Sequence, residues 1–203
     1  MAIPLLKEFP LVPPADLGPY RRKDYEALPD EPRCELIYGR FYVSPSPLVL
    51  HQLVVGLLYE ILIRIALPVR GMVLLSPMDV YLADHSVVQP DLLYISAGRR
   101  RVAQKRIEGA PDLVVEVLSP GTARRDRNEK LRLYAEKGVG EYWIFDVTER
   151  QIEFLLNEDG QFVVALPEDG VYRSKTLPEI SLDIVELWRE IDQRLDLLNA
   201  DED

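Results

Sequence analysis

Hydrophobic and polar residues follow two different periods along this chain. The stretch "CELIYGRFYVS" (34–44) alternates between the two classes and turns at Gly39, which is typical of a β-hairpin. The stretch 48–67 is apolar over most of its length, and its polar positions recur every fourth residue: Gln52, Gly56, Glu60 and Arg64. This spacing predicts a helix that is mostly buried and carries one narrow polar stripe.

Apolar runs after this helix predict three strands and a second helix. The strands are "GMVLLSPMDVYLA" and "VVQPDLLYIS", joined around Asp84–His85, and then "PDLVVEVL". Thr122 can cap a helix that runs to about Lys137 and stops at Gly138. A further strand, "GEYWIFDV", precedes the hairpin formed by "QIEFLLN" and "QFVVAL" around the turn "EDG".

A last helix is expected to start near Asp183. Its apolar positions fall on one face at helical spacing: Ile184, Leu187, Trp188, Ile191, Leu195 and Leu198. The element order predicts an α/β fold (α+β, with a mixed sheet) in which helices flank a central sheet. We expect a proline-rich extended arm over 1–20, one domain over 21–199 and an acidic tail over 200–203.

Composition and charge restrict the binding partners and the cellular compartment that we expect for this domain. The net charge of −10 speaks against a general affinity of the surface for nucleic acid. Residues 96–137 nevertheless hold 11 Lys and Arg against 6 Asp and Glu, which fits either a local phosphate-binding surface or solvated charged faces. The single cysteine and the lack of a signal-peptide pattern indicate a cytoplasmic protein, and the charges within 48–67 indicate a core helix rather than a membrane span.

Four charged residues stand at positions where a packed fold does not favour them. Glu116 lies in the middle of the apolar strand "LVVEVL", where an unpaired carboxylate would cost several kcal/mol or have a raised pKa. Asp91 opens "LLYIS", Lys130 lies on the helix after the Glu116 strand, and Glu35 begins the first hairpin. Each has an ordinary structural explanation when taken alone, but neighbouring strands and a returning helix can bring all four to one point.

Carboxylates that lie close together repel each other unless a cation binds between them. Mg²⁺ suits such a position because it takes oxygen ligands and keeps several waters, and Mn²⁺ is the alternative. The predicted ligands are Asp91, Glu116 and Glu35. A divalent ion acidifies a bound water and neutralises a phosphoryl oxygen, and the Lys130 ammonium adds positive charge for the transition state.

These residues lie in motifs that resemble a known family. "VVQPDLLYIS" and "GAPDLVVEVLSPGTARRDRNEKLRLYAEKGVGEYWIFDV" resemble the PD-(D/E)XK nuclease superfamily, and more closely its Uma-type family of restriction-endonuclease-like proteins. The resemblance extends over roughly 25–188. It implies a restriction-endonuclease-like core, with Asp91 as the "PD" aspartate and Glu116 as the acidic residue of the (D/E)XK element.

The sequence departs from the superfamily pattern at one position. Leu118 stands where that pattern has its lysine, and the resemblance implies that Lys130, on the following helix, takes this place. Glu35 matches the early glutamate of the family and would be a third acidic group. His51 matches a family position to which we assign no role.

Three functions are compatible with these features. The first is a metal-dependent endonuclease that hydrolyses DNA phosphodiester bonds, which the set Asp91, Glu116 and Lys130 favours. The second is a catalytically silent module that binds nucleic acid or protein on a nuclease fold, which the net charge of −10 favours. The third is a phosphodiesterase for small nucleotides. The long apolar helix at 48–67 and the helix that bears Trp188 further suggest a homodimer.

Overall fold

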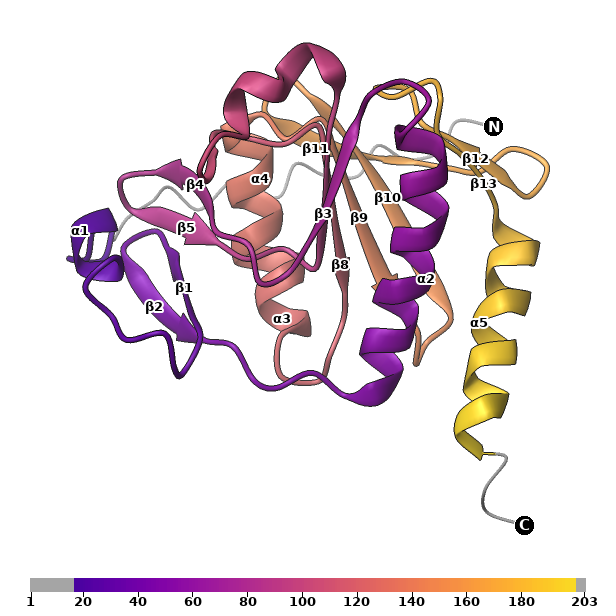
Figure 1. Cartoon of the computed structure of the whole chain (residues 1–203), viewed down its shortest axis with the longest axis horizontal. Helices are drawn as coiled ribbons and strands as arrows, with labels where there is room; N and C mark the ends of the chain where they lie inside the picture. Colours follow the sequence, from indigo (N-terminus) through magenta and orange to yellow (C-terminus); the bar gives the residue numbers. More distant parts are fainter. Residues whose placement is uncertain (1–16, 200–203) are drawn as a thin grey trace, which may run out of the picture.

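The computed structural model describes residues 17–199, with side chains described to 196, so most of the predicted arm and the whole acidic tail lie outside the described residues. The described residues form three sheets and their helices (Figure 1). The mixed α+β fold with helix-flanked sheets confirms the predicted fold class. Two clusters of buried apolar side chains lie one on each face of the largest sheet, and a third, smaller cluster contains Leu36, Tyr81 and Val87.

The largest sheet has six strands in the order β11-β10-β9-β8-β6-β3. Only β8 and β9 are parallel, and the other neighbours are antiparallel. The strands are β3 (Met72–Leu75), β6 (Leu92–Ile95), β8 (Leu113–Val117), β9 (Glu141–Asp146), β10 (Gln151–Glu158) and β11 (Gln161–Ala165). The predicted hairpin around "EDG" is therefore β10 and β11.

A smaller sheet lies beside the first and has the strand order β2-β1-β5-β4-β7. Its strands are β1 (Cys34–Ile37), β2 (Arg40–Val43), β4 (Val80–Ala83), β5 (Ser86–Val88) and β7 (Ile107–Glu108). Strands β1 and β2 form the predicted hairpin, and Gly39 adopts the positive φ of +74° that the tight turn requires. A third, two-stranded sheet pairs β12 (Val171–Arg173) with β13 (Ser181–Asp183).

Two of the predicted strands are each divided between the sheets, which corrects the sequence analysis. Residues 72–83 form β3 in the large sheet and β4 in the small one, and residues 86–95 form β5 and β6 in the same way. Pro77 and Pro90 lie at the two crossings. Because proline has no N–H to donate, a ladder breaks there and the chain can leave one sheet for the other.

Helices cover both faces of the large sheet. Helix α2 (Val49–Ala66) packs against β3 and β8, and α5 (Ile184–Asn199) packs beside it on the same face (Figure 1). By length and composition α2 could cross a membrane, a test that core helices also pass, and here its buried residues join the cluster under the sheet. A short helix, α1 (Arg22–Tyr25), precedes the small sheet.

The second predicted helix has the expected bounds, but the Thr122 side chain forms no capping hydrogen bond, and the helix is not uniform. It consists of α3 (Ala123–Arg125), one π-helical turn, η2 (Asp126–Lys130), and α4 (Leu131–Lys137). Gly138 ends it in the left-handed conformation, with φ +80°. Sequence patterns do not predict this π turn, the 3₁₀ helix η1 (Ala97–Val102) or the short strands β7, β12 and β13.

Candidate active site

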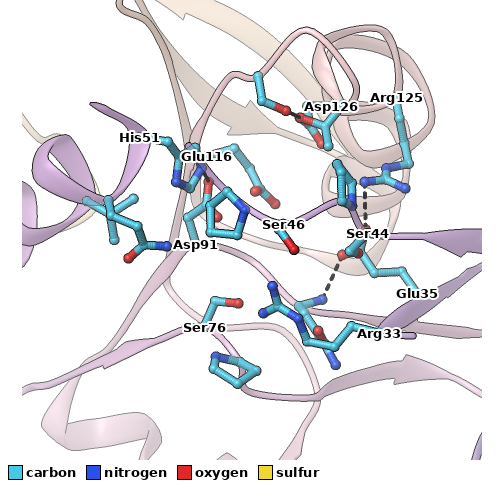
Figure 2. A pocket seen from close by; sticks show the side chains of 18 of the residues that line it. Arg33, Glu35, Ser44, Ser46, His51, Ser76, Asp91, Glu116, Arg125 and Asp126 are labelled. Atoms are coloured by element: carbon cyan, nitrogen blue, oxygen red, sulfur yellow. Dashed lines mark hydrogen bonds and ion pairs between the residues drawn. The ribbon is translucent and has the colours of Figure 1, made fainter. Parts of the chain in front are cut away.

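The candidate residues converge on one pocket at the boundary between the two larger sheets. Glu35 comes from β1, Glu116 from β8 and Lys130 from η2, while Asp91 immediately precedes β6. They line a pocket of about 350 Å³, to which His51 of α2 also contributes. Figure 2 shows Asp91, Glu116 and His51 on one side of this pocket and Glu35 with Arg125 on the other.

Glu116 faces the pocket because of strand alternation. Leu113, Val115 and Val117 point toward α2 and join the cluster on that face, whereas Val114 joins the opposite cluster with Tyr134 of α4. Glu116 shares the face of Val114, so its carboxylate meets the helix that follows β8. The chain turn at 119–122 therefore folds this helix back over its own strand.

Lys130 links the acidic groups of the pocket. Its Nζ lies 2.8 Å from Glu116 Oε1, 2.9 Å from Glu35 Oε1 and 3.5 Å from Asp126 Oδ1. The Lys130 side chain is only 3% exposed, so these contacts lie in a poorly solvated interior. The neighbouring carboxylates outweigh the effect of burial and raise the pKa of Lys130 well above its ordinary value, so the side chain is an ammonium ion.

The Glu116 carboxyl accepts two hydrogen bonds, but its burial still disfavours the ionised form. Its Oε1 accepts hydrogen bonds from Lys130 and, at 3.0 Å, from the Tyr134 hydroxyl. Burial raises the pKa of Glu116 well above its ordinary value; Lys130 opposes this effect, and Asp91 adds to it. A second cation near Glu116 would stabilise the ionised form of its carboxyl.

Asp91 is oriented by one backbone and one side-chain contact. Its Oδ2 accepts a hydrogen bond from the Val117 N–H at 2.8 Å and lies 3.0 Å from His51 Nε2. Burial lowers the pKa of His51, but its contact with Asp91 dominates and the net shift is upward. His51 thus fixes the orientation of the Asp91 carboxyl, a role for which the sequence offered no assignment.

Glu35 is fully buried, although the alternation of its hairpin is equally compatible with an outward-facing residue. Its side chain is 1% exposed, and its Oε1 accepts a hydrogen bond from the Gln89 N–H at 2.7 Å as well as from Lys130. Its Oε2 lies 3.4 Å from Arg125 Nη2. Oε1 is thus fully engaged, whereas the buried Oε2 accepts no hydrogen bond from a described residue, and the assignment of Glu35 as a metal ligand stays a prediction.

The pocket holds more negative than positive charge. Four carboxylates, those of Glu35, Asp91, Glu116 and Asp126, share the pocket with three cations, Lys130, Arg125 and Arg33, which leaves one negative charge in excess. Burial raises the pKa of Asp126, and Lys130 opposes this effect. A cation bound in the pocket would offset the excess of negative charge.

The donor set fits a metal that relies on few protein ligands. Within residues 17–199, no group of three or more His, Cys, Asp or Glu side chains is arranged to hold a metal ion. No described residue donates a hydrogen bond to Asp91 Oδ1 or to Glu116 Oε2. Two free carboxylate oxygens suit Mg²⁺, which is commonly bound through one or two carboxylates, water and substrate phosphate.

Several pocket residues escaped the sequence analysis as functional candidates. Arg125 and Gln89 hold Glu35, and neither stands in an unusual sequence environment that could have marked it. The spacing of four on either side of Lys130 does predict that Asp126 and Tyr134 share its helix face, although the sequence assigned neither a role. In the structure Asp126 lies 3.5 Å from Lys130 and the Tyr134 hydroxyl donates to Glu116.

Comparison with known proteins agrees with this architecture. Residues 22–185 match the Uma2 family, described as "Putative restriction endonuclease". The crystal structure of a "putative nuclease belonging to DUF820" from Anabaena variabilis superposes with a TM-score of 0.71 and 20% identity, covering 85% of this chain and 99% of that one. At this identity the match shows a shared fold. No curated protein matches the chain.

Proposed function

Because the chain belongs to the Uma2 family, described as "Putative restriction endonuclease", we propose that it is a metal-dependent endonuclease that hydrolyses DNA phosphodiester bonds. The observation that supports this most is the pairing of Asp91 and Glu116 in one pocket that has an excess of negative charge and two free carboxylate oxygens.

In this proposal Asp91 and Glu116 hold Mg²⁺ or Mn²⁺. Such an ion, when bound, would supply an acidified water and positive charge at a phosphoryl oxygen. Lys130 keeps Glu116 oriented and places a fixed ammonium where negative charge grows on the phosphorus oxygens. His51 and the Val117 N–H hold Asp91 in the orientation that leaves its Oδ1 free.

Two features favour the alternative of a catalytically silent binding module on the same fold. The Lys130 ammonium is already surrounded by Glu35, Glu116 and Asp126, so a substrate phosphate would have to compete for it. The net charge of −10 also opposes the approach of DNA. These two properties would suit a structural site better than a catalytic one.

A plasmid-nicking assay with Mg²⁺ or Mn²⁺ tests the proposal. The wild type should convert supercoiled DNA to the open form, and chelation with EDTA should stop it. Glu116→Gln should abolish nicking, because the amide keeps the acceptor for Lys130 and Tyr134 but removes the charged ligand. If the variant nicks as fast as the wild type, the assignment is wrong. If neither is active with either ion, the silent module is favoured.

A further inference from the structure

The proposed metal ligands and Lys130 line a recessed pocket and not a flat face. The side chains of Glu116, Lys130 and Glu35 are at most 4% exposed. Residues 44–47, between β2 and α2, and the crossing at Ser76–Pro77 form parts of the pocket wall (Figure 2). Access through such an opening is easier for one flexible strand than for a rigid duplex.

The basic segment 96–137 offers little free charge to a duplex. Duplex binding depends on Lys and Arg that neutralise many phosphates. Most arginines of this segment instead form ion pairs within the chain: Arg99 with Asp112, Arg106 with Glu26, Arg125 with Glu35, Arg127 with Asp146 and Arg132 with Glu136. Most arginines of the basic segment are therefore already neutralised by carboxylates of the same chain.

Arg33 differs from these arginines. It lines the pocket of the carboxylates, and no described residue forms an ion pair with its guanidinium. It also lines a second pocket of about 440 Å³, which adjoins the first through Arg33 and Gln89. A free cation thus stands between two cavities, one of which holds the proposed metal ligands.

The second pocket has fixed hydrogen-bonding groups in its wall. Gln89 Nε2 donates to Asp79 Oδ1 at 2.9 Å and lies 3.2 Å from the Tyr25 hydroxyl, which itself donates to Asp79 Oδ1 at 2.7 Å. These mutual hydrogen bonds fix the Gln89 amide in the wall beside the candidate site, and fixed polar side chains are what proteins use to read the exposed edge of an unpaired base.

We propose that the substrate is single-stranded DNA, with the scissile phosphate at Asp91 and Glu116, the neighbouring base in the second pocket, and Arg33 on the phosphate between them. This inference rests on the proposed nuclease function and adds its substrate class. Unpaired strands need no broad cationic surface, because a short groove and local base contacts hold them. The acidic exterior then disfavours duplex DNA.

The test compares one labelled oligonucleotide as a single strand and in a duplex, with Mg²⁺ or Mn²⁺. The wild type should cut the single strand at least about tenfold faster, the factor expected when one unpaired base must otherwise be extracted from a stack. Equal or faster cutting of the duplex would overturn the substrate class and leave the nuclease function standing.

If no oligonucleotide is cut, the proposed nuclease function fails, and binding then decides the substrate class separately. Fluorescence anisotropy with Glu116→Gln in Mg²⁺ should show tighter binding of the single strand than of the duplex. Weaker or equal binding of the single strand would overturn the inference as well.

A pair of arginine variants tests the contact itself. Arg33→Ala should lower kcat/KM on the single strand about tenfold, as expected for one lost charge-assisted hydrogen bond. Arg101→Ala, an exposed arginine of η1 that lines neither pocket, removes the same charge and should have little effect. Both should retain the melting temperature of the wild type. Equal losses in the two variants would mean that only net charge matters and would reject Arg33 as the phosphate contact.

Discussion

At the scale of single residues, the buried Lys130 ammonium holds the pocket together. Lys130→Ala would leave Glu35, Glu116 and Asp126 buried without their shared cation. Removing one partner of a buried ion pair typically costs about 3–5 kcal/mol, so we expect the unfolding free energy at neutral pH to fall by about that amount. Urea denaturation measures the loss. The control Lys105→Ala, at an exposed position, should change little; similar values for both would contradict the structural role of Lys130.

The raised pKa of Glu116 makes stability depend on pH in a known direction. An acid whose pKa is higher in the folded state stabilises the fold fully below its unfolded pKa, near 4.5, and loses this contribution as the pH rises through the folded value. Metal-free wild type should therefore lose stability relative to Glu116→Gln between pH 4.5 and neutrality. Thermal denaturation of both proteins measures the difference. Added Mg²⁺ should reverse it in the wild type alone, and parallel curves would refute the pKa shift.

The contact between His51 and Asp91 predicts an effect on metal affinity. His51→Ala frees Asp91 from its side-chain partner, and loss of such a supporting hydrogen bond typically weakens metal binding about 10- to 100-fold. His85 contacts Ser86, lies outside the pocket and provides the matched control. Calorimetric titration with Mn²⁺ should separate the two variants. Unchanged affinity in His51→Ala would show that the Val117 N–H alone orients Asp91.

At the scale of elements, two helical glycines should respond to alanine in opposite ways. Gly138 has φ +80°, where a side chain is strained, so Gly138→Ala should destabilise by about 1 kcal/mol. Gly56 lies inside α2 with open space around the added methyl group, so Gly56→Ala should stabilise by about 0.5–1 kcal/mol. Chemical denaturation tests both. Destabilisation by Gly56→Ala would mean that α2 packs more tightly there than described.

Helices and hairpins that follow from local sequence pattern could be predicted. The points at which the chain passes from one sheet to the other could not. Periodicity identified α2, both hairpins and the end of α4 at Gly138. It could not show that one apolar run serves two sheets, because a strand looks the same on either side of Pro77 or Pro90. For the same reason, the burial of Glu35 could not be read from its hairpin: its polar face meets η2, which lies 91 to 95 residues further along the chain.

At the scale of the whole molecule, the association of two chains stays a prediction. Part of the apolar surface of α2 is covered by α5 of the same chain, and Arg194 of α5 pairs with Glu60 of α2 at 2.8 Å. Exposed apolar side chains remain at the ends of α2, namely Leu48, Val49 and Leu67. We expect light scattering to give twice the 23.3 kDa of one chain; a single-chain mass at high concentration would reject the homodimer.

The ion pair between Lys130 and Glu35 has a mechanical consequence. Glu35 belongs to the small sheet, while Lys130 lies on the helix packed against the large one, so this contact bridges two separately hydrogen-bonded bodies. A small rotation of one body against the other would separate the two groups while leaving every strand ladder intact. The Lys130–Glu35 ion pair therefore depends on the relative orientation of the two sheets. A ligand that rearranges the charges in the pocket would also change the strength of the contact between the sheets.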